Sequence, residues 1–194
     1  MNIQQLEDSR VKLTLLDLSN YKSLIPIAKQ EDLVKYSPTD IATEETLKNY
    51  VQTALDGYYH NTCIPFLVFD KSKNAYAGCT RFMNINAKQK VLDIGSTWIG
   101  YEFHGTGLNA HMKFLMLQYA FERLEYERVE FKVDERNIRS RKAIEGIGGT
   151  LEGILRQNLY LLDGYKRNTC IYGILKAEWD VLKTTVFKDF KNSY

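Results

Sequence analysis

Two glycines, Gly105 and Gly107, lie in the segment His104-Gly105-Thr106-Gly107-Leu108-Asn109, which follows a strand-like run and precedes a helix-like run. A glycine has no Cβ, so the backbone around it approaches a phosphate closely and adopts positive φ angles. The first N–H groups of a helix have no intrahelical partners, and the helix dipole favours negative charge there. We therefore expect this segment to hold a pyrophosphate, although such a glycine pair on its own more often marks a plain structural turn.

The remaining reactive side chains form no familiar catalytic set. The sequence shows no Ser/His/Asp arrangement, no metal-ligand spacing and no Walker loop, so we expect no metal. His104 and His111 titrate near neutral pH, but a lone histidine is more often structural than catalytic. Cys63, Cys79 and Cys170 are scattered in apolar runs without a CxxC pair, and they are predicted to be buried thiols.

The hydrophobic pattern predicts the elements that position these residues. Seven stretches with a period of two are expected to be strands, at residues 10–16, 63–70, 76–85, 91–100, 129–134, 150–160 and 168–175. The strands at 63–100 form an antiparallel meander. A strand, a helix and a strand follow one another between residues 91 and 134, which implies a right-handed parallel crossover.

Five helices are predicted from apolar residues at spacings of three and four. The first covers residues 18–28, with Pro26 making its second half doubtful, and the second begins after the N-cap Thr43 and stops at Gly57. The third follows Gly107, the fourth covers residues 138–147 after the N-cap Asn137, and the last is expected at about 177–190. Together these elements predict one mixed α/β domain over residues 1–194, with helices on both faces of the sheet.

Composition restricts the class of partner. The net charge is +2 and the sequence pI is near 8.3, so bulk electrostatics gives no support for nucleic-acid binding. No run approaches the roughly 18 apolar residues that a membrane span needs, and the N-terminal residues do not read as a signal peptide. We therefore expect a cytoplasmic protein without a membrane partner.

Several short motifs in order resemble one enzyme family. They are Ile94-Gly-Ser-Thr-Trp-Ile99, His104-Gly-Thr-Gly-Leu-Asn-Ala110, Val129-Glu-Phe-Lys-Val-Asp134, Asn137-Ile-Arg-Ser140, Ile147-Gly-Gly149 and Glu152-Gly-Ile-Leu-Arg156. Over roughly residues 60–180 the chain resembles the Rim-type branch of the GNAT acetyltransferases. The resemblance implies a GNAT-like fold, with a mixed, mostly antiparallel sheet of about seven strands, and acetyl-CoA as co-substrate.

The resemblance also implies which residues hold acetyl-CoA. The family signature is Gln or Arg, two residues, Gly, one residue, then Gly or Ala, and these positions are His104, Gly107 and Asn109 here. Because the first and last positions depart, the resemblance carries over the backbone cradle of residues 104–109 and no cation at position 104. Main-chain groups of Trp98, Ile99 and Gly100 would contact the pantetheine arm in a gap between strands 91–100 and 129–134.

The helix after the second of these strands is implied to contact the same ligand. Asn137 and Ser140 would lie near the sulfur end or the thioester. Four basic residues follow closely in sequence: Arg136, Arg139, Arg141 and Lys142. They either meet the nucleotide phosphates or form a solvated helix face, and the sequence favours neither.

The catalytic groups are harder to assign. Asp93 is the first candidate for the general base, because it stands where histone-type relatives carry a glutamate, and Glu102 is the second. The alternative for both is a plain exposed carboxylate. A late carboxylate of some Rim-type relatives falls at Leu159, and the tyrosine that serves as acid in many relatives falls at Ile144, so Ser140 is the substitute acid.

The resemblance implies transfer of an acetyl group to a primary amine, and its Rim-type branch suggests a peptide or protein N-terminus. A small amine such as a polyamine, an amino acid or an antibiotic is the first alternative acceptor. The second alternative is a non-catalytic CoA-binding module, which the departures at Leu159 and Ile144 motivate. A monomer and a homodimer are both compatible with the sequence.

Overall fold

The structure is a computed structural model that describes residues 5–190, in which all strands join a single sheet. The strands are β1 (Gln5–Glu7), β2 (Val11–Leu15), β3 (Ile64–Asp70), β4 (Ala75–Asn86), β5 (Val91–Ile99), β6 (Arg128–Asp134), β7 (Thr150–Tyr160) and β8 (Lys166–Leu175). The α-helices are α1 (Ile25–Ala28), α2 (Glu44–Tyr59), α3 (Leu108–Gln118), α4 (Ile138–Gly146) and α5 (Lys176–Thr184). Short 3₁₀ helices at Tyr21–Leu24 and Tyr101–Phe103 and a π-helical turn at Tyr119–Arg123 complete the order.

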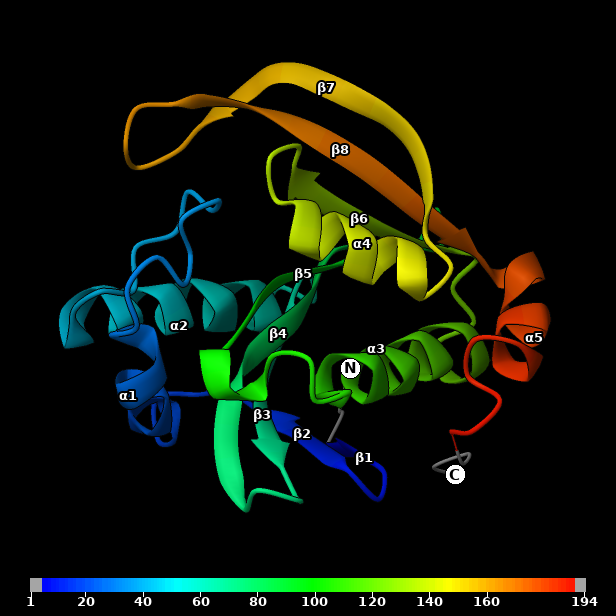
Figure 1. Ribbon diagram of the computed structural model, residues 1–194, viewed down its shortest axis with the longest axis horizontal. Helices are drawn as coiled ribbons and strands as arrows, with labels where there is room; N and C mark the ends of the chain where they lie inside the picture. The colour runs from blue at the N-terminus through cyan, green and yellow to red at the C-terminus, as the bar shows by residue number, and fades with distance from the viewer. Residues whose placement is uncertain (1–4, 191–194) are drawn as a thin grey trace.

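The strand order is β1-β2-β3-β4-β5-β6-β8-β7. Only β5 and β6 pair in parallel, and the other described neighbours pair antiparallel. Because α3 connects β5 to β6, the predicted parallel crossover is confirmed. In Figure 1, β7 and β8 form a long hairpin along the top of the molecule, away from β1–β4.

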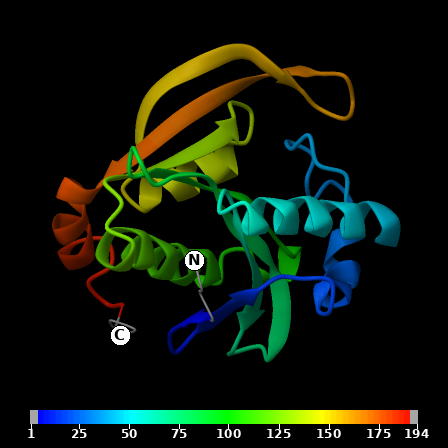
Figure 2. The same cartoon turned by 180° about the vertical axis from the view of Figure 1, so that it is seen from behind.

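The predicted placement of helices on both faces of the sheet is confirmed by two hydrophobic clusters. The larger cluster contains the apolar residues of α3, such as Leu108 and Leu115, together with Trp179 of α5. The smaller cluster joins α1 and α2 to the other face, where Tyr50 meets Trp98. In Figure 2, which views the molecule from behind, α2 lies on the right and α3 on the left. Burial of these apolar faces is what fixes each helix against the sheet.

Two predicted helix caps are confirmed. The Thr43 side chain accepts a hydrogen bond from the Thr46 N–H, and the Thr46 side chain accepts one from the Thr43 N–H, which closes a capping box at the start of α2. The Asn137 side chain accepts a hydrogen bond from the Ser140 N–H at the start of α4.

Two predictions about the first two helices are wrong. The first helix is a 3₁₀ turn followed by the four-residue α1, since Pro26 is tolerated only in the first turn of an α-helix. Gly57 does not stop α2, which continues to Tyr59. It is a glycine because an added Cβ would lie 2.8 Å from the Cys63 Cβ.

The terminal helix is shorter than expected. α5 ends at Thr184, where the hydroxyls of Thr184 and Thr185 donate hydrogen bonds to the Val181 carbonyl at 3.0 and 2.7 Å. Phe187 lies beyond the helix, with its ring centroid 5.3 Å from that of Phe114. Its helical spacing therefore reflects burial in a folded-back tail.

One strand was not predicted, and the thiols behave as expected. β1 is a three-residue strand that pairs with β2, so the described sheet has one strand more than the seven predicted. Cys63, Cys79 and Cys170 are buried and free, as predicted. Within residues 5–190, no helix has the length and apolar character needed to cross a membrane.

Candidate active site

The two parallel strands at the centre of the sheet separate after three residue pairs. β5 and β6 are paired at Val91↔Arg128, Leu92↔Val129 and Asp93↔Glu130, and their pairing ends there. β5 nevertheless continues to Ile99 and β6 to Asp134. The edge of β5 that faces β6 therefore has no strand partner over residues 94–99. The Ser96 carbonyl accepts a hydrogen bond from the Tyr50 hydroxyl and the Ile99 carbonyl is bonded to His104, and the remaining edge groups are left for an extended ligand.

A cavity of about 580 Å³ occupies this gap. Its walls include residues 94–99 of β5, residues 131–134 of β6, the turn before α3, one side of α4 and part of the segment 32–39. Of the residues predicted to bind acetyl-CoA, those that line it are Trp98, Ile99, His104, Gly105, Gly107, Asn109, Asn137 and Ser140. Gly100, Thr106 and Leu108 do not line it, so any contact from these three would come from the adjoining backbone.

The glycine turn has the geometry of an anion cradle. Gly105 and Gly107 have φ angles of +70° and +85°, and nothing lies within 4 Å of a Cβ added at either. Glycine is needed there for its backbone conformation, since L side chains rarely adopt it. The N–H groups of residues 105–107 make no hydrogen bond within the described part of the chain, while the Thr106 hydroxyl donates to the Phe103 carbonyl at 2.8 Å and pins the turn.

His104 connects this turn to α4. Its Nε2 lies 3.1 Å from the Ile99 carbonyl, and its Nδ1 lies 2.8 Å from Nη1 of Arg139. A carbonyl only accepts hydrogen bonds, so Nε2 carries the proton and Nδ1 accepts from the guanidinium. Burial and the neighbouring Arg139 hold the pKa of His104 below its usual value. The cation beside the cradle is therefore Arg139, held by a neutral histidine.

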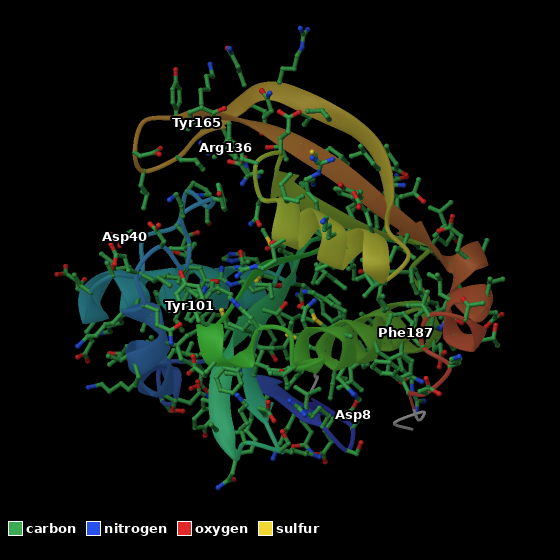
Figure 3. All side chains as sticks on the ribbon, in the orientation of Figure 1. Asp8, Asp40, Tyr101, Arg136, Tyr165 and Phe187 are labelled. Carbon is green, nitrogen blue, oxygen red and sulfur yellow. The ribbon has the colours of Figure 1, made fainter. Side chains whose placement is uncertain are left out.

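The other members of the basic run are committed elsewhere or turned away from the cradle. Arg136 binds the Asp134 carboxylate at 2.8 Å, and its guanidinium lies 3.6 Å from the centre of the Tyr165 ring. Figure 3 shows Arg136 and Tyr165 close together near the β7–β8 hairpin. Arg141 donates to the Tyr172 hydroxyl at 3.0 Å, and Lys142 is exposed. The structure thus divides the run and brings Arg139 alone of the four to both the cavity wall and the cradle.

Asp93 is buried at the point where the strands part, but it does not line the cavity. Its Oδ2 accepts hydrogen bonds from the Asn84 amide and the Lys132 ammonium, each at 2.7 Å. Burial opposes the charge of Lys132, yet the bond to Asp93 holds the pKa of this lysine above its usual value. The first candidate base is therefore an ion-paired carboxylate, and its catalytic role stays a prediction.

The other catalytic candidates differ in position. Glu102 is exposed and accepts a hydrogen bond from Gln30 at 3.0 Å, outside the cavity lining. Ser140 and Ile144 both line the cavity from α4. The Ser140 hydroxyl makes no hydrogen bond within the described residues, so it is available to a ligand.

The sequence pattern does not single out Lys113, which lies in the apolar run of α3. Its side chain is 5% exposed and lines the cavity, where Nζ is 2.8 Å from the Thr97 hydroxyl and 3.3 Å from that of Thr80. Burial lowers the pKa of Lys113 to about 7. The signal available in the sequence is a charged residue inside Met-Lys-Phe-Leu-Met-Leu, a run that otherwise faces the core.

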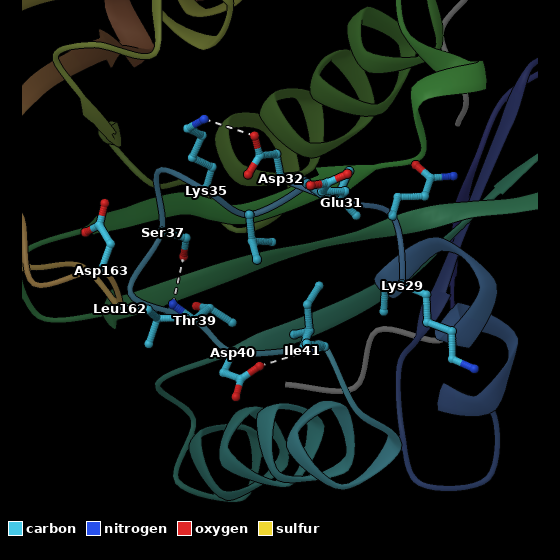
Figure 4. Close-up of a pocket in the computed structure, with 15 residues that line it drawn as sticks. Lys29, Glu31, Asp32, Lys35, Ser37, Thr39, Asp40, Ile41, Leu162 and Asp163 are labelled. Carbon is cyan, nitrogen blue, oxygen red and sulfur yellow. Dashed lines mark hydrogen bonds and ion pairs between the residues drawn. The ribbon is translucent and has the colours of Figure 1, made fainter.

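A second, open cavity of about 440 Å³ adjoins the first. It lies between the segment of residues 28–42 and the tip of the β7–β8 hairpin, where Leu162 and Asp163 face the segment across the cavity in Figure 4. The two cavities share Asp32, Leu33, Val34, Ser37 and Thr39 as lining residues. The segment of residues 28–42 therefore borders both the cavity in the β5–β6 gap and the second, open cavity.

Among residues 5–190, no group of three or more His, Cys, Asp or Glu side chains is arranged to hold a metal ion.

Comparisons with known proteins agree with this geometry. A family model described as "Acetyltransferase (GNAT) domain" matches residues 10–150. The chain is 33% identical over 114 residues to the Bacillus subtilis (strain 168) protein named "Putative ribosomal N-acetyltransferase YdaF", and this match covers 59% of the chain and 60% of that relative.

Two solved structures share the fold over nearly the whole chain. A "putative acetyltransferase" from T. thermophilus superposes with a TM-score of 0.86 at 28% identity, covering 98% of this chain and 99% of the other. A GCN5-related N-acetyltransferase from Brucella melitensis superposes with a TM-score of 0.85 at 27% identity, covering 97% and 86%.

Proposed function

Because this chain belongs to the GNAT acetyltransferase family, we propose that it transfers the acetyl group of acetyl-CoA to the N-terminal α-amine of a peptide or protein. The family supplies the reaction class. The acceptor class rests on the site itself, and the printed name of the B. subtilis relative, a ribosomal N-acetyltransferase, points the same way.

The cavity and the turn fit acetyl-CoA as the acyl donor. The left-handed Gly105 and Gly107 with the free N–H groups of the cradle suit the pyrophosphate, and Arg139 adds a cation beside it. Residues 94–99 offer an unpaired strand edge to the amides of the pantetheine arm. Asn137 and Ser140 would contact the ligand from α4.

The observation that supports an α-amine as the acceptor is that the carboxylates at the cavity are ion-paired. Asp32 and Asp134 line the cavity and are paired with Lys35 and Arg136, and Asp93 beside it is paired with Lys132. An α-amine is neutral to about one part in ten at pH 7, whereas a lysine side chain is neutral to less than about one part in a thousand. A site whose carboxylates are all ion-paired suits the amine that needs least help from a base.

Backbone donors of β5 would stabilise the oxyanion that forms when the amine attacks the thioester carbonyl. We propose Asp93 as the group that receives the amine proton, through water, because it lies at the closed end of the gap. The open cavity beside residues 28–42 would admit the peptide. Glu31, Asp40 and Asp163 line that cavity beside Lys29 and the paired Asp32 and Lys35, and the excess of negative charge would attract a cationic N-terminus.

A panel of acceptors tests this proposal. Thiol release from acetyl-CoA is measured at pH 7 with a lysine-free peptide that has a free N-terminus, and with the same peptide blocked at its N-terminus and given one lysine. Turnover is expected with the first peptide, with mass spectrometry placing the acetyl group on its α-amine.

Small amines complete the panel. Faster turnover of a polyamine, an amino acid or an antibiotic would contradict the peptide as acceptor. Binding of acetyl-CoA without turnover of any amine would contradict acetyl transfer itself and favour a binding module.

A further inference from the structure

Lys113 brings a buried amine into the cavity without a carboxylate beside it. No ion pair is formed by this side chain within residues 5–190, and its two hydrogen bonds go to the hydroxyls of Thr97 and Thr80. Those two hydroxyls are themselves 2.7 Å apart. A desolvated, unpaired amine is costly to keep in a protein interior, so a role in the cavity is a natural reason for its presence.

Thr97, to which Lys113 donates a hydrogen bond, lies in the part of β5 that has no β6 neighbour. Thr97 lies three residues before Gly100 and lines the cavity, whereas Thr80 is fully buried behind it. Strand residues 94–99 extend over about 20 Å at about 3.3 Å each. A pantetheine arm that starts at the glycine cradle and follows this edge reaches its sulfur within that stretch.

The groups that face Lys113 from the neighbouring elements leave its charge uncompensated. From β4 comes the Cys79 thiol, whose pKa burial raises to about 11, so it is neutral at physiological pH. Tyr50 of α2 bonds Cys79 at 3.4 Å, and burial raises its pKa as well. Arg81 of β4 stacks on the Tyr50 ring at 3.7 Å, and on α3 itself His111 is bonded to Asp8.

We propose that Lys113 is the proton source for the departing thiolate of CoA and that the Thr97 hydroxyl, which contacts the sulfur, passes the proton. This inference rests on the proposed acetyl transfer and assigns the acid that the reaction requires. Ile144 has no proton to give, and the Ser140 hydroxyl is a much weaker acid than an ammonium.

The step balances as follows in atoms and electrons. The acceptor nitrogen forms a C–N bond to the carbonyl carbon, the C–S bond breaks, and its electron pair remains on sulfur. Thr97 gives its hydroxyl proton to sulfur and takes one from Lys113, while the proton lost by the amine leaves through Asp93 and water. Lys113 then regains a proton from solvent, so acetyl-CoA and amine yield amide and CoA.

The proton transfer runs downhill. A free thiol has a pKa of about 8.5, above the value of about 7 for Lys113. An acid must be protonated to act, so the lysine is active below that value and loses its proton above it. We expect kcat for an α-amine to fall as pH rises beyond about 7 to 8, once the amine itself is neutral.

The test combines turnover with a measurement that needs none. The variants are Lys113→Met, Lys113→Arg, Thr97→Val and Thr97→Ser, with Lys48→Met on the exposed face of α2 as the matched control. The first readout is kcat against pH with acetyl-CoA and the peptide acceptor. The second is the ultraviolet absorbance of thiolate when CoA is bound at pH 8.

The lysine variants separate charge from proton donation. Lys113→Met is expected to lower kcat at least about tenfold and to remove the fall of kcat at high pH. It should leave the thiolate absorbance of bound CoA nearly unchanged, because the wild-type lysine is mostly neutral at pH 8. Lys113→Arg is expected to raise that absorbance, because a guanidinium stays charged at pH 8 and favours the thiolate, yet it loses turnover because it gives up no proton. Thr97→Ser retains kcat and Thr97→Val does not, while Lys48→Met matches the wild type.

The outcomes distinguish the two proposals. If Lys113→Met binds CoA and keeps the wild-type kcat and pH profile, or if Lys113→Arg does not raise the thiolate absorbance, the role of Lys113 is overturned and acetyl transfer stands. If the wild-type protein does not bind CoA at all, both proposals are overturned.

Discussion

Lys113 carries its amine into the sheet interior at a cost that depends on pH. Burial lowers its pKa to about 7 in the folded protein, against about 10.4 for an unfolded lysine. Between these two values the unfolded chain binds one proton more than the folded chain, so the free energy of unfolding rises with pH, by about 1.4 kcal/mol per pH unit at most. Below about pH 7 both states are protonated and the full cost is present.

Replacing Lys113 with methionine removes this contribution while keeping a side chain of similar shape. Thr80 and Thr97 still bond each other at 2.7 Å, so no hydroxyl is left unpaired. The variant is expected to be more stable than the wild type by a few kcal/mol at pH 7, with the difference shrinking toward about pH 9.5. Urea unfolding of both proteins across this range measures it, and a difference that does not change with pH would show that Lys113 is not buried as a cation.

A substitution at Gly107 tests whether the glycine turn binds the phosphates of acetyl-CoA. Its φ of +85° is strained for any residue with a Cβ, at a cost of about 1–3 kcal/mol, and an added side chain would project into open space where the phosphates are proposed to lie. Gly107→Val is expected to weaken acetyl-CoA binding at least about tenfold by calorimetry. Gly153→Val is the matched control, because Gly153 also has open space around its Cβ but lies on β7 without a positive φ. Equal affinities of the two variants would rule out the cradle.

At the scale of elements, the sequence allows the strands and the capped helices to be predicted, because alternating burial and caps are local properties. Thr43 and Asn137 start α2 and α4 as expected, since each hydroxyl or amide satisfies a helix N–H three residues on. Gly57 misleads because a glycine often ends a helix where the chain turns left-handed, whereas here the glycine is required by the close approach of Cys63, just after the helix. Phe187 misleads because helical spacing also describes a tail that folds back on Phe114.

In the candidate site too, local features are predictable from the sequence, whereas contacts between residues far apart in the chain are not. The glycine turn and Asn137 are predictable because backbone conformation and capping depend on neighbours in the chain. The ion pair of Asp93 with Lys132 and the bond of His104 to Arg139 join residues far apart in sequence, so one sequence does not reveal them. Lys113 also belongs to this group, since its hydrogen bonds go to two threonines from β4 and β5, which are far from it in sequence.

At the scale of the whole molecule, the sheet consists of two parts that share a hydrophobic core but are joined by few strand pairs. β1–β5 form one part and β6, β8 and β7 the other, and three residue pairs between β5 and β6 join them within the sheet. Figure 1 shows β6, β8 and α4 in the upper part of the molecule and α3 below α4. A ligand that fills the gap and bonds the free edge of β5 would complete the contact between the two parts.

This arrangement predicts a specific pattern of amide exchange. Without ligand, the β6-facing amides of residues 94–99 have no backbone partner across the gap, so they should exchange faster than those of the fully paired β3. Saturating CoA is expected to slow exchange in residues 94–99 and 105–107. It should also raise the free energy of unfolding by about 2.7 kcal/mol at about one hundred times its Kd. Hydrogen–deuterium exchange followed by mass spectrometry measures the first effect, with β3 as the internal reference. Gly107→Val at the same CoA concentration should lose both protections together, because the cradle holds the ligand that bridges the sheet. Protection confined to residues 105–107 would instead mean that CoA binds the turn without entering the gap.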